Sequence, residues 1–140
     1  MDVVSEIKKL DFPASEYVVI GGAAMALRGI RETDDLDIAV SPELFEKCKQ
    51  EGWEVMLWTK PGKMNAEWLK KGKAELFQEI IMTGDNLKFA DLSKDIEIVK
   101  GVPCLSLERM VELKKEYLGL YGRRKDTDDL VLIGKAAKRR

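Results

Sequence analysis

The strongest constraint on the fold comes from a strand, two glycines and a short helix that follow one another near the start of the chain. Residues 17–20 form an aromatic and β-branched run, which is typical of a β-strand, and the run stops at Gly21-Gly22. Residues 23–28 then have high helix propensity and end at Gly29, a favoured residue after a helix C-terminus. A strand that leads directly into a helix favours a fold that combines a sheet with helices.

A pair of carboxylates follows this segment. Asp35 and Asp37 flank the start of a second expected strand, residues 36–40, and side chains two apart on a strand point to the same face, where they can share Mg²⁺. The sequence contains four acid-x-acid pairs, and with this many acids about four are expected by chance. The pair is therefore informative only through its context, because the preceding glycines can admit a phosphate whose oxygens a metal ion would bridge.

The remaining pattern alternates strands and helices early in the chain and becomes helical late. We expect an α+β fold with α/β-like character, in which helices flank a mixed β-sheet and a helical pair ends the chain. A length of 140 residues favours a single domain, with the sheet in residues 14–102 and the final helices in residues 105–138. Further helices are expected at residues 3–10, 42–51, from Ser106 onward and around Leu130; further strands at residues 53–59, 74–82 and 96–99; and a turn at residues 60–63.

Composition limits the chemistry that the chain can perform. It has no histidine, which excludes Ser-His-Asp and Cys-His catalysis and His-ligated zinc. The 24 Lys and Arg residues nearly cancel the 25 Asp and Glu residues, so a general basic coat for nucleic acid is excluded. Cys48 and Cys104 lack a metal or redox spacing, no signal-peptide pattern opens the sequence, and no apolar run approaches the ~20 residues that cross a bilayer. We therefore expect a cytoplasmic protein that does not enter a membrane.

Residues 19–38 resemble the signature of the nucleotidyltransferase superfamily related to DNA polymerase β. In that superfamily an apolar strand and a Gly-Gly or Gly-Ser pair precede Asp-x-Asp, and here the 12 residues 23–34 intervene. The form Arg-x-Thr-x-Asp-x-Asp at residues 31–37 is similar to that of the small AbiEii-like, or minimal, nucleotidyltransferases. The resemblance implies the nucleotidyltransferase fold for the whole domain.

The resemblance also implies a third carboxylate on a later strand. Residues 78–84 match that stretch and place Glu79 in the position, although Asp is commoner there. Glu75 is the alternative if the register differs, and Glu79 would then be an ordinary strand carboxylate.

Two further blocks extend the resemblance toward the C-terminus. Residues 101–114 resemble the segment that introduces the helical part of the family, and Lys114 matches a lysine that is often turned toward the nucleotide phosphates. Residues 123–130 resemble the pattern Arg-x-Lys-Asp-x-x-Asp, which covers Arg123, Lys125, Asp126 and Asp129. Each has a structural alternative: Lys114 could be a solvated helix lysine, and the four charged residues could form ion pairs that fix one helix to the next.

The function that the resemblance implies is transfer of a nucleoside monophosphate from an NTP, with release of pyrophosphate. Asp35, Asp37 and Glu79 would hold Mg²⁺ or Mn²⁺ and activate the acceptor. The phosphates would contact the backbone near Gly21 and Gly22, together with the side chains of Arg31 and Lys114. The acceptor stays open among RNA, a protein and a small hydroxylated molecule.

Two other interpretations remain open. One is a non-catalytic module of the same fold, such as a component of a toxin–antitoxin system that binds a partner protein. The other is a structural domain in which the motifs are accidental. Because a chain of this length leaves little room for a separate substrate domain, specificity could reside in a partner protein or at a homodimer surface.

Overall fold

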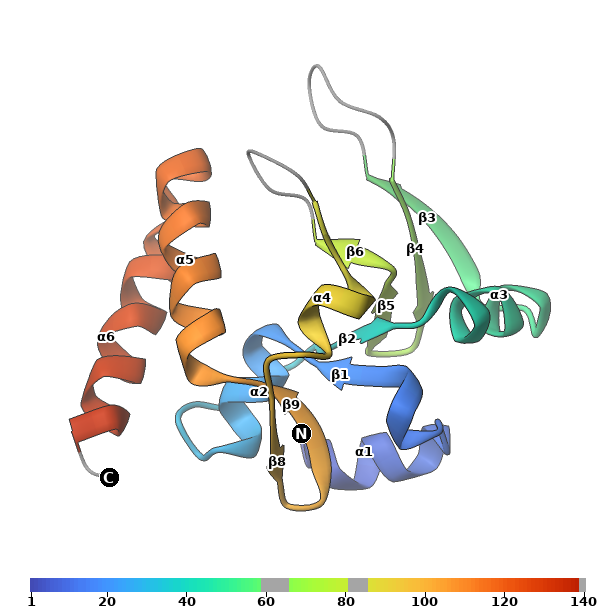
Figure 1. The fold of residues 1–140 in the computed structure, drawn as a ribbon, viewed down its shortest axis with the longest axis horizontal. Helices are drawn as coiled ribbons and strands as arrows, with labels where there is room; N and C mark the ends of the chain where they lie inside the picture. The colour runs from blue at the N-terminus through green and yellow to red at the C-terminus, as the bar shows by residue number, and fades with distance from the viewer. Residues whose placement is uncertain (59–65, 81–85, 139–140) are drawn as a thin grey trace.

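The computed structural model describes residues 1–58, 66–80 and 86–138, and its centre is a seven-stranded mixed sheet (Figure 1). The strands are β1 (Tyr17–Val19), β2 (Leu36–Val40), β3 (Glu54–Trp58), β4 (Ala66–Lys71), β5 (Ala74–Phe77), β6 (Glu79–Ile80), β7 (Leu87–Lys88), β8 (Ile96–Val99) and β9 (Val102–Leu105). The helices are α1 (Val3–Leu10), α2 (Gly21–Leu27), α3 (Pro42–Gln50), α4 (Phe89–Leu92), α5 (Leu107–Tyr121) and α6 (Arg124–Lys138), with a 3₁₀ turn, η1, at Ala14–Glu16. The sheet order is β3-β4-β5-β2-β1-β9-β8, while β6 and β7 form a separate pair.

The centre of the sheet brings the end of β1 beside the start of β2. β1 runs antiparallel to β2 and parallel to β9, whereas β2 runs parallel to β5. Val18, Val19 and Ile38 are 1% exposed or less, so these strands form the centre of the core. The backbone N–H of Ile20 donates to the backbone carbonyl oxygen of Asp37 at 3.0 Å. This hydrogen bond places the turn after β1 next to Asp37.

Capping residues fix the ends of two helices that flank the sheet. Ser41 precedes α3, and its Oγ accepts a hydrogen bond from the backbone N–H of Leu44. Ser106 caps α5 in the same way, and Gly122 ends that helix in the left-handed region at φ 60°. The sequence signals for both helix starts are therefore confirmed.

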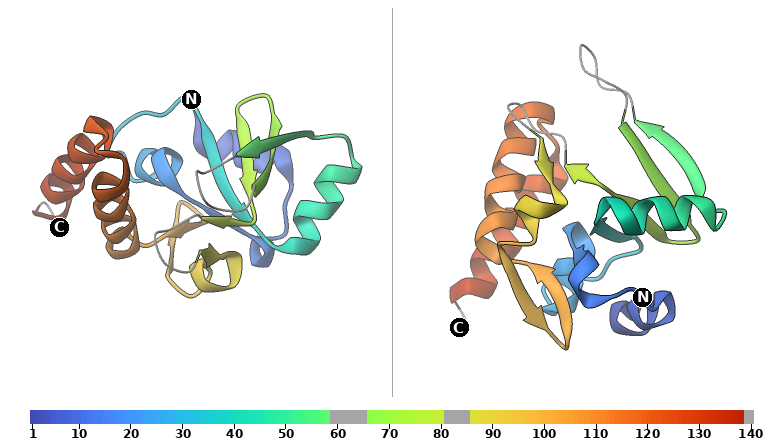
Figure 2. Two further views of the ribbon diagram at one scale, coloured as in Figure 1. Left: turned by 90° about the horizontal axis from the view of Figure 1, so that it is seen from above. Right: turned by 45° about the vertical axis from the view of Figure 1, so that its right-hand side comes forward.

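The last two helices, α5 and α6, form a hairpin whose members lie side by side in all views (Figures 1 and 2). The expected mixed sheet with flanking helices and a C-terminal helical pair is confirmed. Throughout the described ranges, no helix has both the length and the apolar character needed to cross a membrane.

The sequence does not predict β4, β9 and α4. β4 contains adjacent lysines and β9 contains Pro103, but each strand has a partner on both sides in the sheet, and this pairing overrides the weak local propensity. The strand expected at residues 74–82 ends at Phe77, and β6 begins separately at Glu79. The turn expected at residues 60–63, and residues 81–82 of that expected strand, lie outside the described residues.

Candidate active site

The two glycines at the start of α2 allow unusually close packing of the neighbouring segments. Gly21 lies in the left-handed region at φ +60°, and a Cβ built on it would be 3.2 Å from Oδ2 of Asp37. A Cβ on Gly22 would lie 2.9 Å from Oγ1 of Thr33 and 3.1 Å from the Arg31 guanidinium nitrogens. Glycine at these positions therefore lets the Asp-x-Asp segment and the loop before it approach the helix.

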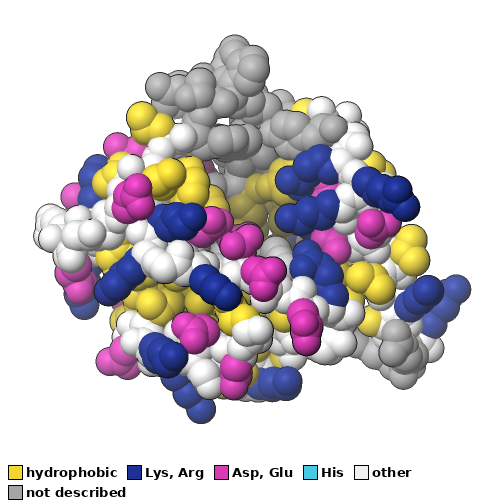
Figure 3. Space-filling model, turned by 180° about the vertical axis from the view of Figure 1, so that it is seen from behind, with side chains coloured by type: hydrophobic (Ala, Val, Ile, Leu, Met, Phe, Trp, Pro, Cys, Tyr) yellow, Lys and Arg dark blue, Asp and Glu magenta, His cyan; other side chains and the backbone are white. Residues whose placement is uncertain are grey.

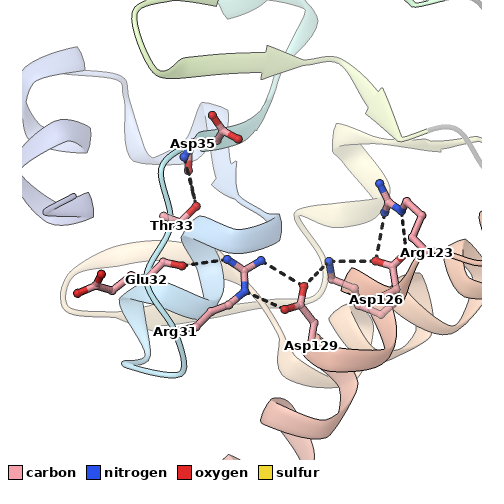
Figure 4. A network of polar contacts seen from close by, with 8 residues as sticks. Arg31, Glu32, Thr33, Asp35, Arg123, Asp126 and Asp129 are labelled. Atoms are coloured by element: carbon pink, nitrogen blue, oxygen red, sulfur yellow. Dashed lines mark hydrogen bonds and ion pairs between the residues drawn. The ribbon is translucent and has the colours of Figure 1, made fainter.

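Asp35 and Asp37 have different surroundings although they are two residues apart. Asp35 is exposed at the end of the loop, where its backbone is fixed by Thr33 (Figure 4). Oγ1 of Thr33 accepts from the Asp35 N–H at 3.3 Å and donates to the Asp35 carbonyl oxygen at 3.0 Å. Asp37 is half-buried within β2. The loop thus presents Asp35 to solvent and holds it beside the more enclosed Asp37.

Asp37 faces another carboxyl group on the adjacent strand. The parallel register of β2 and β5 places Asp37 opposite Glu75, and the two side chains share a hydrogen bond. Burial, this hydrogen bond and the charges of Glu75 and Asp35 together raise the pKa of Asp37 to about 7. Oδ1 of Asp37 is buried and has no hydrogen-bond partner among the described residues. A carboxylate held in this way is suited to receive a cation.

Glu79 lies farther along the chain, on β6 rather than on β5. Its Oε1 accepts a hydrogen bond from the side-chain amide of Asn86 at 3.2 Å, and it lines the same cavity as Asp37 and the two glycines. Within the described ranges, no three Asp, Glu or Cys side chains form a group that could hold a metal. The third carboxylate therefore stays a prediction.

Arg31 and Lys114 form ion pairs with two buried acids of α6, Asp126 and Asp129, of which Figure 4 labels both acids and Arg31. Nε of Arg31 donates to Oδ1 of Asp129 at 2.8 Å, and Nζ of Lys114 lies 2.9 Å from Oδ2 of the same residue. Lys114 also reaches Oδ1 of Asp126 at 3.3 Å, and Nε of Arg123 donates to Oδ2 of Asp126 at 2.8 Å. These five residues, which we call the clasp, join the loop before β2 to both C-terminal helices.

The two acids of the clasp are almost fully enclosed, because Asp126 is 0% and Asp129 3% exposed. Burial acts to raise the pKa of Asp129, but hydrogen bonds and charge from Arg31 and Lys114 outweigh it, and the pKa lies below its ordinary value. Lys114 is buried and ion-paired rather than solvated. Of the four charged residues for which ion pairs were the alternative, Arg123, Asp126 and Asp129 form such pairs with clasp residues, whereas Lys125 has no ion pair with another described residue.

Two cavities meet at Gly22, Asp37 and Lys125, which line both. The aromatic cavity, of about 380 Å³, is lined by Trp68, Phe77, Met110, Leu113 and Tyr117, with Asp37, Glu67, Glu79, Lys114, Arg123 and Lys125. The acidic cavity, of about 500 Å³, is lined by Glu32, Asp34, Asp35, Asp37, Asp128 and Asp129, with Arg31 and Lys125. The space-filling view shows acidic and basic side chains interspersed over one face of the molecule (Figure 3).

The sequence does not identify the cavity-lining roles of Phe77 and Tyr117. Neither belongs to a motif of fixed spacing, and only strand register and helix docking bring them near Asp37. From the sequence, Trp53, Trp58 and Trp68 are expected to be core or rim residues rather than base-stacking platforms. Trp53 is buried at 7% exposure, which confirms this for that residue, whereas Trp68 is half-buried at the aromatic cavity.

Comparison with known proteins places this fold among nucleotidyltransferases. A candidate nucleotidyltransferase of Thermotoga maritima, TM1012, is 25% identical with a TM-score of 0.59, covering 99% of this chain and 92% of its own. The antibiotic-resistance factor ANT(2'')-Ia is 15% identical. Its crystal structure in complex with adenylyl-2''-tobramycin has a TM-score of 0.56 over 96% of this chain and 85% of that one. Its solution structure has a TM-score of 0.58 over 96% and 80%.

The sequence comparisons add no closer relative. No protein-family model matches the sequence, and no curated protein sequence matches it significantly. The structural neighbours support a fold of the nucleotidyltransferase superfamily. The narrower AbiEii-like assignment stays a prediction.

Proposed function

We propose that this chain is a nucleotidyltransferase that transfers a nucleoside monophosphate from an NTP to an acceptor. An acceptor oxygen would form a bond to the α-phosphorus, the bond from that phosphorus to the bridging oxygen would break, and pyrophosphate would leave with the electron pair. One observation carries the proposal. The half-buried Asp37 lies against Gly21 with Asp35 beside it, its Oδ1 has no hydrogen-bond partner among the described residues, and the fold is shared with nucleotidyltransferases.

The carboxylates of Asp35 and Asp37 fit a divalent cation such as Mg²⁺ or Mn²⁺. Among the described residues, no group donates to the buried Oδ1 of Asp37, and the carboxyl groups of Asp35 and Glu75 lie next to it. A bound cation would relieve the repulsion between these negative charges. When bound, the ion would neutralise phosphate charge and lower the pKa of the acceptor group. Asp37 would supply the enclosed ligand, and Asp35 the accessible one.

The third carboxylate has two candidates. Glu79 is the residue predicted from the sequence, and it lines the aromatic cavity. From there it could take the proton from the hydroxyl group that receives the nucleoside monophosphate. Glu75 contacts Asp37 directly, which favours it as a further ligand or proton acceptor. Separate Glu75→Gln and Glu79→Gln variants distinguish the two, because only the residue that acts on the reaction should reduce the transfer rate strongly.

The cations are assigned by their contacts. Arg31 and Lys114 both form ion pairs with Asp129, and these pairs favour a role in holding the loop before β2. Contact of Arg31 and Lys114 with the phosphates stays a prediction from the sequence. Lys125 has no ion pair with another described residue and lines both cavities, so it is the better placed cation for the phosphates. Backbone N–H groups near Gly22 would assist it.

The test is transfer of label from each α-labelled NTP with Mg²⁺ to total RNA, to protein and to a polyhydroxylated amine. We expect the wild type to transfer label to one of these acceptors. Asp35→Ala/Asp37→Ala is expected to lose both transfer and Mg²⁺-dependent NTP binding by calorimetry while keeping an equal or higher melting temperature. A matched control, Glu43→Ala/Glu46→Ala, removes the same charge from exposed positions on α3 and should behave as the wild type. NTP binding that survives in the Asp35/Asp37 variant would contradict the metal assignment.

A second candidate function is a non-catalytic module that binds a partner protein, as in a toxin–antitoxin pair. Glu79, which stands where Asp is commoner in the family pattern, lies on β6 and not on β5, and this position favours the second function. Stable binding of a partner chain or of a second copy, without transfer of label from any NTP, is the expected result for this function.

A further inference from the structure

A stacked pair of aromatic rings lines the aromatic cavity, on the same sheet face as Asp37. Trp68 on β4 pairs in register with Phe77 on β5, and their rings stack at 5.7 Å between centroids and 24° between planes. Phe77 is two residues after Glu75, the register partner of Asp37, so all four side chains project from one face. Trp68 and Phe77 are both half-buried and both line the cavity, so the pair is not closed off by the core.

The remaining wall of this cavity is cationic. It comes from α5 and the start of α6, which the ribbon views place across from β4 and β5 (Figures 1 and 2). Lys114, Arg123 and Lys125 line it, and the Arg123 guanidinium lies 5.4 Å from the ring centre of Tyr117. A ligand here would have an aromatic surface on one side and positive charge on the other.

The two cavities differ in charge, and this difference decides which of them can accept a triphosphate. Three cations and three carboxylates line the aromatic cavity, and two of these cations, Lys114 and Arg123, also pair with Asp126 and Asp129 of the clasp. In the acidic cavity six carboxylates face only two cations, so the aromatic cavity is the less negative of the two. A triphosphate would be repelled from the acidic cavity and accepted more readily in the aromatic one. A volume of about 380 Å³ is within the range of small-molecule sites.

We propose that the aromatic cavity binds the base of the donor nucleotide against the Trp68–Phe77 pair, with the phosphates directed to Gly22, Asp37 and Lys125. The proposal rests on the nucleotidyltransferase function proposed above and names the part of the site that recognises the donor. Stacking on an aromatic wall accepts the π-face of any base, so this wall supplies affinity for the base.

The test is calorimetric binding of each NTP and of inorganic tripolyphosphate, both with Mg²⁺, to the wild type and to variants. Trp68→Leu and Phe77→Leu are each expected to weaken NTP binding about tenfold, because stacking of one base contributes on that order. Tripolyphosphate binding should be unchanged. Trp68→Phe should restore most of the affinity, since it keeps an aromatic ring. The control Leu57→Ala changes a 64% exposed side chain on β3 that projects from the opposite face, and should change neither ligand.

The outcomes separate this proposal from the function on which it rests. Wild-type NTP binding in both leucine variants, with melting temperatures near that of the wild type, would overturn the base wall and leave the proposed function intact. Loss of transfer at unchanged NTP affinity would also overturn it, because the wall would then serve the acceptor. A wild-type protein that binds neither NTP nor tripolyphosphate would contradict both.

Discussion

The clasp and the Asp37 site both enclose carboxylates, but they provide opposite partners. Asp126 and Asp129 contact Arg31, Lys114 and Arg123, so every enclosed negative charge has a cation within hydrogen-bond distance. Asp37 faces the carboxyl group of Glu75, and its Oδ1 has no hydrogen-bond partner in the part of the chain that the structure describes. The pKa consequently moves below its ordinary value at Asp129 and above it at Asp37.

The difference separates a structural use of charge from a functional one. A buried acid that is fully paired contributes to stability mainly because its removal would strand its cations. A buried acid without a cation destabilises the protein alone, and this cost is recovered only when a positive ligand binds. The clasp therefore holds the helices and loop in place, while the Asp37 site is arranged for a partner from outside.

The largest effect is expected when the clasp is broken. Asp126→Ala should lower the free energy of unfolding by about 3–5 kcal/mol, because it removes a fully buried acid and leaves the positive charge of buried Lys114 with one partner fewer. Urea denaturation measures the change. In the control Glu112→Ala, which removes a 67% exposed partner of Arg109, the loss should stay below about 0.5 kcal/mol. Equal losses in the two variants would show that the clasp carries no special stability.

A smaller effect, of opposite sign, is expected at the unpaired acid. Asp37→Asn should raise the free energy of unfolding at slightly alkaline pH by about 1–4 kcal/mol, because the pKa of Asp37 is raised from 3.8 to about 7. Between these two values the folded state binds more protons than the unfolded state, so this group makes the wild type less stable as pH rises. The gain should be complete above the folded pKa and absent below 3.8.

Thermal unfolding across pH with EDTA present measures this gain. Asp129→Asn provides the contrast, because the pKa of Asp129 is lowered in the folded protein. The ionised Asp129 therefore stabilises the folded state at neutral pH, and this stabilisation is lost as the pH falls below the ordinary pKa of an aspartate. Asp129→Asn should therefore be destabilised most at neutral pH. An Asp37→Asn effect that does not vary with pH would contradict the assignment of an unpaired carboxylate.

The smallest stability effect is expected at Lys125, which lies in sequence between clasp residues but faces Asp37. Lys125→Met should change the free energy of unfolding by no more than about 0.5 kcal/mol, and it should raise the pKa of Asp37 further, because the Lys125 charge lowers that pKa. Thermal unfolding across pH reports both quantities. Arg123→Met, two residues earlier, should cost about 1 kcal/mol through its contacts with Asp126. A larger loss in the free energy of unfolding for Lys125→Met than for Arg123→Met would contradict the assignment of Arg123, and not Lys125, to the clasp.

The parts of the fold that could be predicted are those encoded by local signals. The strand at residues 36–40 and the helix that starts after Ser106 are confirmed, because β-branched residues and a capping serine act within a few residues. β4 could not be predicted, since its lysines become strand residues only between β3 and β5. Pro103 likewise obscures β9 until β1 and β8 pair with it.

The same division holds for the candidate site. Gly21, Asp35 and Asp37 belong to one local motif, and the structure brings them together. The closeness of Glu75 to Asp37 depends on the register of two parallel strands, which sequence spacing does not define. The partner of Arg31 lies 98 residues away, so a prediction from local sequence could assign Arg31 to phosphate but could not identify Asp129.

The Arg31–Asp129 contact also has a consequence for the order in which the chain assembles. It closes a segment of 98 residues, whereas pairing of β1 with β2 joins residues no more than 23 apart. Longer loops cost more entropy to close, so the hairpin-like pairing that sets Gly21 beside Asp37 can form early, before α6 has docked. During synthesis, the two aspartates would therefore be in place before Asp129 has emerged. A chain that stops short of α6 would keep the strand pairing but lose the contact that holds the loop.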